Sequence, residues 1–236
     1  MSGTLYIVSI PIGNPGDISL RAIEVIKACD TLICEEAKPA RRLLVQLGAE
    51  KEFILLNEHT TTQATSEALD LLKSGKSLAL ISDDGTPLLA DPGSELVQES
   101  IKRNIRIVPV PGASSILAAL VASGFSLLSF TFAGFLPRDK TARKKAASEY
   151  KMRNETLVFL EAPYRLNQLL QDLNDALGSQ RRAVLCMDLT MPSERLERGT
   201  LGSLLKYFTE HPFKGEFVLI VDGKREAFLP HGPRSN

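Results

Sequence analysis

The start of the chain carries the stretch that decides the fold, Leu5-Tyr6-Ile7-Val8-Ser9-Ile10-Pro11-Ile12-Gly13-Asn14-Pro15-Gly16-Asp17. Its first part, 5–10, is mostly apolar and rich in β-forming residues, which indicates a buried strand. The prolines and glycines that follow force a turn. Asp17 is then a candidate N-cap, because apolar residues resume after it at helical spacing (Ile18, Ala22, Ile23, Val25 and Ile26). A strand, a turn and a helix in this order are typical of an α/β domain.

Short apolar runs alternate with amphipathic stretches along the rest of the chain. Further strands are predicted at 31–34, 53–56, 77–81, 105–110, 130–133, 156–160, 183–188 and 216–221. Further helices are predicted at 40–47, 64–73, 92–103 (capped by Asp91), 114–122, 140–151, 164–177 and 201–208. Strands that alternate with helices imply βαβ units, so we expect an α/β fold of two α/β domains with mostly parallel sheets.

The domain boundary is expected at the apolar hinge 122–128, which contains Gly124. Residues 1–123 would then form an N-terminal α/β domain and residues 124–224 a C-terminal one. The tail 225–236 is expected to be poorly ordered.

Composition excludes several classes of protein. In 236 residues, 28 Lys and Arg balance 28 Asp and Glu, which argues against a uniformly basic nucleic-acid wrapper. Three widely spaced cysteines fit neither a disulfide framework nor a zinc knuckle, and no histidine completes a metal motif (Cys29, Cys34, Cys186, His59, His211 and His231). No apolar run reaches the ~20 residues of a membrane span. We therefore expect a cytoplasmic protein without a metal.

Loops after predicted strands are expected to carry the chemistry, because parallel sheets bind ligands at the carboxyl ends of their strands. The loop 11–17 lacks the GxGxxG spacing of dinucleotide sites, and an ordinary turn explains it equally well. The loop 82–93 combines glycines and prolines with three carboxylates. Capping of the next helix explains Asp91, whereas Asp83 and Asp84 are left for ribose hydroxyls or an amino group.

Three further segments each have a structural and a functional interpretation. The N–H groups of 110–115 are able to bind a carboxylate or an adenine edge, although its serines are equally plain N-caps. Glu161 and Arg165 have the spacing of an ion pair at a helix start, which is the simpler interpretation. Glu58 and His59 follow the third strand, where a lone histidine is more often structural than catalytic.

Two charged stretches also leave two interpretations open. The run 34–42 is either a solvated helix start or a holder for a phosphate-bearing substrate. The segment 138–153 has two acidic residues against seven basic ones (Arg138, Lys140, Arg143, Lys144, Lys145, Lys151 and Arg153). It is either an RNA-backbone patch or a solvated helix face.

Taken in order, the loops resemble those of the tetrapyrrole methylase superfamily of S-adenosylmethionine-dependent methyltransferases. The likeness covers about residues 4–222. Its motifs are Pro11-Ile12-Gly13-Asn14 with Gly16-Asp17, Ser82-Asp83-Asp84-Gly85-Thr86-Pro87 with Asp91-Pro92-Gly93, Pro111-Gly112-x-Ser114, Gly134-Phe135-Leu136-Pro137, Glu161-x-Pro163-x-Arg165 and Lys214-Gly215-Glu216. Within the superfamily, the chain looks most like the branch that 2′-O-methylates a cytidine of small-subunit ribosomal RNA.

This resemblance implies two α/β domains with the cofactor cleft between them, usually in a homodimer that acts on ribosomal RNA or the small ribosomal subunit. It assigns S-adenosylmethionine to Ile10, Pro11, Asp83, Gly85, Thr86, Pro87, Ser114, Ser115, Phe159 or Leu160, Leu189 and Gly215. It assigns the substrate side to Asn14, Asp17, Glu35, Glu36, Arg41, Glu161 and Arg165. We add Glu58 and His59 to that side from their place after the third strand.

Some positions depart from the pattern of the ribosomal branch. Glu35-Glu36-Ala37-Lys38 replaces Glu-Asp-Thr-Arg, Met187-Asp188-Leu189-Thr190-Met191 replaces Arg-Glu-Leu-Thr-Lys, and Tyr164 replaces a histidine. The cofactor loops keep the pattern better than the substrate side does, so methyl transfer is better supported than the acceptor.

A sulfonium methyl is already activated, so the protein has only to align the two reactants and remove the hydroxyl proton. Glu36 and Lys38 are the predicted catalytic groups, with Glu58 and His59 behind them. Two alternatives remain: a small tetrapyrrole-like acceptor, and a cofactor-binding protein without RNA methylation activity.

Overall fold

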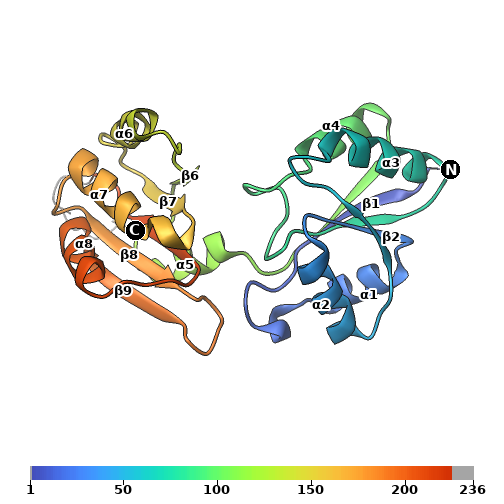
Figure 1. The fold of residues 1–236 in the computed structure, drawn as a ribbon, viewed down its shortest axis with the longest axis horizontal. Helices are drawn as coiled ribbons and strands as arrows, with labels where there is room; N and C mark the ends of the chain where they lie inside the picture. Colours follow the sequence, from blue (N-terminus) through green and yellow to red (C-terminus); the bar gives the residue numbers. More distant parts are fainter. Residues whose placement is uncertain (1, 225–236) are drawn as a thin grey trace, which may run out of the picture. The chain divides into compact units, whose positions relative to one another are not determined.

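The computed structural model describes residues 2–224 and divides the chain into two compact units, one that ends at Ser115 and one that begins at Ile116. Both units are α/β, as expected (Figure 1). The tail 225–236, for which poor order was expected, and His231 within it lie outside the described residues.

The first unit is built on a five-stranded, wholly parallel sheet. Its spatial order is β3 (Glu52–Leu55), β2 (Thr31–Cys34), β4 (Leu78–Leu80), β1 (Thr4–Val8) and β5 (Arg106–Val110). The central strands β2 and β4 are buried along their whole length, which is why they appear in the sequence as unbroken apolar runs.

Helices cover both faces of this sheet (Figure 1). One face buries α1 (Leu20–Ala28) and α2 (Ala37–Leu47), and the other buries α3 (Thr61–Lys73) and α4 (Ser94–Lys102). The connection after β1 runs through α1 on one face, whereas that after the neighbouring strand β4 runs through α4 on the other. Adjacent strands that send the chain to opposite faces form the switch point where α/β sheets bind ligands.

Two predicted helix caps are wrong. Asp17 lies in the short 3-10 helix η1 (Pro15–Asp17), and Ser19 caps α1 by accepting a hydrogen bond from Ala22 N at 3.1 Å. Asp91 does not cap α4, because the chain continues to Gly93, which is the N-cap with φ +116°.

The second unit has a five-stranded sheet in the order β6 (Phe130–Gly134), β7 (Thr156–Leu160), β10 (Phe217–Val221), β8 (Arg182–Met187) and β9 (Arg195–Thr200). Only β6 and β7 pair in parallel, and the other three pairings are antiparallel. The expectation of mostly parallel sheets is therefore wrong for this unit. The antiparallel pairings come from two features. One is the hairpin β8–β9, whose polar second strand was not predicted, and the other is the return of β10 between β7 and β8.

Helices also cover both faces of the second sheet. One face packs against α6 (Lys140–Glu149), α7 (Leu166–Leu177) and α8 (Leu201–Glu210), and the other against α5 (Ser115–Ser123). We expected α5 in the first domain and the boundary after it. The division falls after Ser115, the first residue of α5, because Ile116, Ala119 and Leu120 are buried with strand residues of the second unit.

Within residues 2–224, no helix has both the length and the apolar character needed to cross a bilayer.

Candidate functional site

The loops after β1 and β4 are hydrogen-bonded to each other at the switch point of the first sheet. Ile10 N donates to Gly85 O at 2.8 Å, and Gly85 N donates to Pro11 O at 3.3 Å. Gly85 has φ +72°, and a Cβ added there would lie 2.9 Å from Ile12 Cγ2. This position therefore requires glycine for its backbone conformation and for its close packing.

Two hydroxyl groups extend this connection to the loop after β5. Thr86 Oγ1 donates to Ala113 O at 2.9 Å and lies 2.9 Å from Ser9 Oγ. Because a hydroxyl has one proton, Ser9 is the donor of the second bond. Gly112 completes the contact, since a Cβ there would lie 3.0 Å from Ser9 Cβ. Of the expected cofactor residues, the structure thus brings together Ile10, Pro11, Gly85 and Thr86, and it joins them to Ala113, which precedes the expected Ser114.

The loop after β4 also carries backbone strain that the sequence did not reveal. Leu88 has φ +73° and Ala90 has φ +68°, although neither is glycine. Such conformations cost about 1–3 kcal/mol each and concentrate at ligand sites. Pattern reasoning missed these two positions, because their residue types give no signal for a left-handed backbone.

Asp83 links the loop after β4 to the start of α2. Its Oδ1 accepts a hydrogen bond from Glu36 N at 3.2 Å, and Glu36 itself provides no side-chain cap for that helix. Asp83 therefore caps α2 from another loop. The side chains of Glu36 and Lys38 are exposed at this helix start, while the Arg41 guanidinium lies over the Phe53 ring at 5.3 Å.

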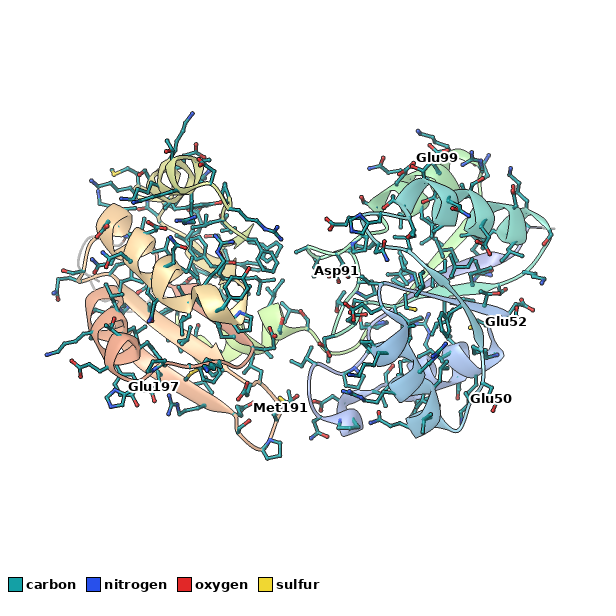
Figure 2. The ribbon with its side chains drawn as sticks, viewed as in Figure 1. Glu50, Glu52, Asp91, Glu99, Met191 and Glu197 are labelled. Carbon is teal, nitrogen blue, oxygen red and sulfur yellow. The ribbon has the colours of Figure 1, made fainter. Side chains whose placement is uncertain are left out.

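Carboxylates converge at the same edge. Burial, followed by the charges of Glu35, Asp83 and Asp84, raises the pKa of Asp91 to about 6. Burial and then Asp83 raise the pKa of Glu35 as well. Figure 2 labels Asp91 on a loop of the first unit, and in the chain this loop lies between β4 and α4. The described residues include no group of three His, Cys, Asp or Glu side chains placed to hold a metal ion. Carboxylate oxygens accept hydrogen bonds, so this edge suits hydroxyl or amino donors.

Other predicted substrate residues of the first unit lie in solvent-exposed turns. Asn14 Oδ1 accepts from Gly16 N at 2.9 Å, and Asp17 ends the same turn. His59 Nε2 lies 3.5 Å from Glu58 Oε1, and the two side chains are 83% and 87% exposed. An exposed pair of this kind provides little electrostatic orientation.

In the second unit, Glu161 and Arg165 form the expected ion pair, with Glu161 Oε1 and Arg165 Nη1 3.2 Å apart. Glu161 is buried, and its Oε1 also accepts from Ala162 N at 2.9 Å. Arg165 Nη2 donates to Pro137 O at 3.4 Å, so the pair connects the loops after β6 and β7.

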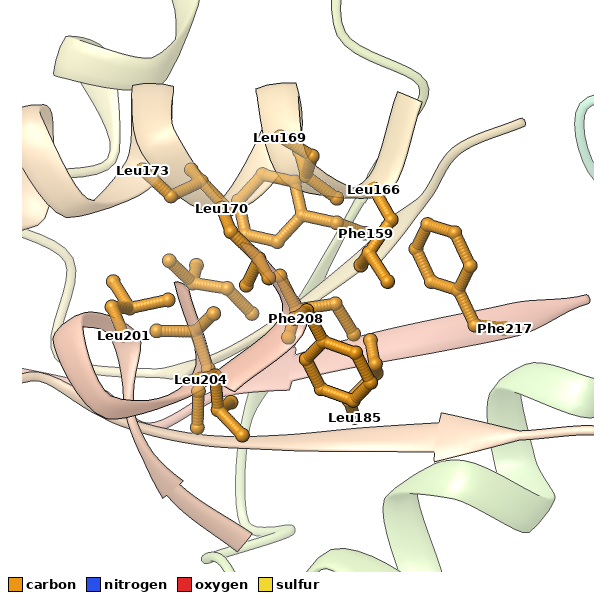
Figure 3. Close-up of a cluster of buried hydrophobic side chains, with 14 of the residues drawn as sticks. Phe159, Leu166, Leu169, Leu170, Leu173, Leu185, Leu201, Leu204, Phe208 and Phe217 are labelled. Carbon is orange, nitrogen blue, oxygen red and sulfur yellow. The ribbon is translucent and has the colours of Figure 1, made fainter. Parts of the chain in front are cut away.

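Three predicted cofactor residues of this unit have different surroundings. The Phe159 ring is fully buried between α7 and the sheet, which leaves no part of that ring for a ligand (Figure 3). Leu189 is half-buried and lies between Asp188 (φ +46°) and Thr190 (φ +66°). A Cβ at Gly215 would collide with the Asp188 carboxylate and the Phe213 ring, so these two side chains lie close against the Gly215 backbone.

The basic segment 138–153 is not uniformly exposed. Arg143 is 2% exposed, and its Nε lies 2.5 Å from Asp172 Oδ2. Counting Arg143 toward an RNA patch is therefore wrong, because its guanidinium pairs with α7 inside the unit. The six other basic residues of the segment are exposed.

The model of the tetrapyrrole (corrin/porphyrin) methylases matches residues 4–205. The chain belongs to this methylase family. Relatives named ribosomal RNA small subunit methyltransferase I include those of Halalkalibacterium halodurans, 40% identical over 97% of this chain and 78% of the relative, and of Leptospira borgpetersenii, 41% identical over 96% and 90%. Methyl transfer is accordingly the reaction class of this methylase.

Solved structures share the fold of this methylase at low sequence identity. Uroporphyrin-III C-methyl transferase from Thermus thermophilus, complexed with S-adenosyl homocysteine, gives a TM-score of 0.66 at 19% identity and covers 93% of this chain and 97% of its own. A conserved hypothetical protein of Aeropyrum pernix gives a TM-score of 0.72 at 17% identity, with coverage of 96% and 86%. At these identities the likeness concerns the fold alone.

Proposed function

We propose that this methylase transfers a methyl group from S-adenosylmethionine to the 2′-oxygen of a cytidine ribose in small-subunit ribosomal RNA. The observation that supports cofactor binding best is the connected edge of β1, β4 and β5, where Gly85 and Gly112 allow close approach of backbone. The names of relatives that match nearly the whole chain support ribosomal RNA as the acceptor.

The residues of this edge suit the chemistry of the cofactor. In the first unit, we propose that the cofactor is held by main-chain groups of Ile10, Pro11, Gly85 and Pro87 and by the hydroxyls of Ser114 and Ser115. Half-buried carboxylates such as Asp83 suit ribose hydroxyl or amino donors. S-adenosylmethionine supplies an activated methyl group when bound.

On the substrate side, Glu36 is proposed to accept the proton of the ribose hydroxyl, with Lys38 beside it to stabilise developing negative charge. Both side chains are exposed: Glu36 is the N-cap of α2, Lys38 lies in its first turn, and Asp83 fixes the start of this helix. Glu36→Gln and Lys38→Ala should each slow single-turnover methylation by about 100-fold or more. Full rates in both variants would overturn these roles and leave the reaction class intact.

A homodimer in the cytoplasm is also proposed. Apolar side chains around the edge strand β6 are exposed, with Leu128 at 97% and Phe130 at 43%, and a second copy of the chain would cover them.

The test is to incubate the protein with methyl-labelled S-adenosylmethionine and small ribosomal subunits from a strain that lacks it. The proposal expects label at one nucleotide of the ribosomal RNA. Intact cofactor binding without label in RNA would contradict it and would direct the search to small acceptors.

A further inference from the structure

Two exposed aromatic rings lie at the carboxyl edge of the second sheet. Phe135 directly follows β6, and Tyr164 belongs to η2 (Pro163–Arg165), the turn after the neighbouring parallel strand β7. Phe135 is 51% and Tyr164 is 82% exposed. Because aromatic rings contribute most when they are covered, two such rings at one strand edge indicate a surface that a ligand covers.

The loop that carries Phe135 is held from within the unit by two guanidinium groups. Pro137 O accepts hydrogen bonds from Arg143 Nη1 and from Arg165 Nη2, each at 3.4 Å. Arg143 Nη1 also donates to Arg138 O at 2.7 Å. The backbone of this loop is therefore fixed at Pro137 and Arg138.

The hydrogen bonds of Arg165 also position Tyr164. Its neighbour Arg165 is 12% exposed in its side chain and pairs with the buried Glu161. One guanidinium thus connects the turn that carries Tyr164 to the loop that carries Phe135. Rings on a fixed backbone bind a ligand with a smaller loss of conformational entropy than rings on mobile loops.

Positive charge continues from Phe135 into α6. Arg138, Lys140 and Lys144 are exposed, and the two lysines are four residues apart on one stripe of the helix. The nearby Asp139 caps α6 by accepting from Ala142 N at 2.8 Å. Cations next to exposed rings match a ligand that has both phosphates and planar bases.

We propose that this aromatic edge (Phe135, Arg138, Lys140, Lys144 and Tyr164) binds an unpaired segment of RNA. Bases stack on the two rings while the cations contact backbone phosphates. Paired bases do not offer their faces in this way, so the edge selects single-stranded RNA over helical RNA. The inference rests on the proposed function and deepens it by specifying the form of the substrate.

The test compares the wild type with the Phe135→Ala/Tyr164→Ala double variant. One readout is the affinity for a labelled 12-nucleotide RNA without self-complementarity, and for the same strand annealed to its complement. The other is the KM for small ribosomal subunits. We expect the double variant to lose about tenfold or more in single-strand affinity and to raise this KM by a similar factor. Binding of the cofactor product S-adenosylhomocysteine should not change.

Two controls separate stacking from general damage. Tyr164→Phe should bind as the wild type does, because stacking needs the ring and not the hydroxyl. Tyr207→Ala removes an exposed ring from α8 of the same unit, and it should change neither readout.

The outcomes distinguish this inference from the proposed function. If the double variant methylates subunits with an unchanged KM, the inference is overturned and the proposed function is not. Ring-dependent binding of single-stranded RNA without methylation of subunits would support the inference and contradict the proposed function. Duplex bound as tightly as single strand, or no ring dependence in either readout, would also overturn the inference.

Discussion

Ser9 donates a hydrogen bond to the hydroxyl of Thr86 across 2.9 Å, and the Thr86 hydroxyl donates a hydrogen bond to the carbonyl of Ala113. Three loops that follow three different strands are therefore joined by two side chains. Ser9 is 4% exposed, so this connection is mostly screened from water. The candidate cofactor edge in the first unit depends on it.

Thr86→Val keeps the shape of this side chain and removes both hydrogen bonds. It leaves the Ser9 hydroxyl and the Ala113 carbonyl without this partner, so the free energy of unfolding should fall by about 1–3 kcal/mol. S-adenosylhomocysteine affinity by calorimetry should fall as well. Thr86→Ser retains the hydroxyl and should preserve both quantities, and equal losses in the two variants would contradict the account.

Gly85→Ala should damage the site more than the fold. The added Cβ meets Ile12 Cγ2 at 2.9 Å and stands on a backbone with φ +72°. Gly48 is a matched control, because it has φ +60° as the C-cap of α2 and no atom within 4 Å of an added Cβ. Both alanine variants should lose about 1–2 kcal/mol of stability in thermal unfolding. Only Gly85→Ala should also weaken S-adenosylhomocysteine binding, by about tenfold or more, and equal affinities would contradict the role of this close approach.

Asp91 should make the folded state less stable as the pH rises. Burial and neighbouring carboxylates raise its pKa from 3.8 to about 6, so the folded state disfavours its ionisation. Stability is then lost as the pH rises through this window. Asp91→Asn stays neutral and should become more stable than the wild type, by about 1 kcal/mol at pH 7 after screening of the half-exposed group.

Urea unfolding at a series of pH values from 4 to 7 measures this effect. The difference in the free energy of unfolding between Asp91→Asn and the wild type should grow with pH. A difference for Asp91→Asn that stays constant would refute the assignment.

Arg143 should stabilise the fold and should make no direct contact with RNA. Arg143→Ala leaves Asp172 buried without its cation, which should cost about 3–5 kcal/mol in urea unfolding. The double variant Arg143→Met/Asp172→Leu should recover most of this loss. Lys144→Ala, on the exposed side of the same helix, should leave stability unchanged while raising the KM for small ribosomal subunits. Unchanged stability in Arg143→Ala would show that the pair is not needed for the fold.

The sequence predicted those elements whose local pattern agrees with their environment. The strands at 31–34 and 156–160 are apolar after their first threonines and are buried except for the half-buried Leu160, so the apolar runs alone located them. Strand β9 was missed because its sequence Arg195–Thr200 is polar, and only pairing with β8 makes it a strand. The direction of β10 is likewise set by its neighbours and leaves no local signal.

The candidate site was predicted through loop motifs and not through side-chain direction. Gly85 and Thr86 belong to a motif, and the structure joins them to the loops expected beside them. Nothing local indicates that Arg143 turns inward from a basic run, or that the Phe159 ring faces the core. Such orientations depend on helix packing, which the sequence pattern does not specify.

The chemical form of the methylated nucleoside tests the central claim most directly. Small-subunit RNA methylated by the purified protein is digested to nucleosides and analysed by mass spectrometry, with Gly85→Ala as the parallel variant. We expect 2′-O-methylcytidine as the new nucleoside, in a yield that falls in the variant. A methyl group on the base, on another nucleoside, or on no nucleoside would contradict it.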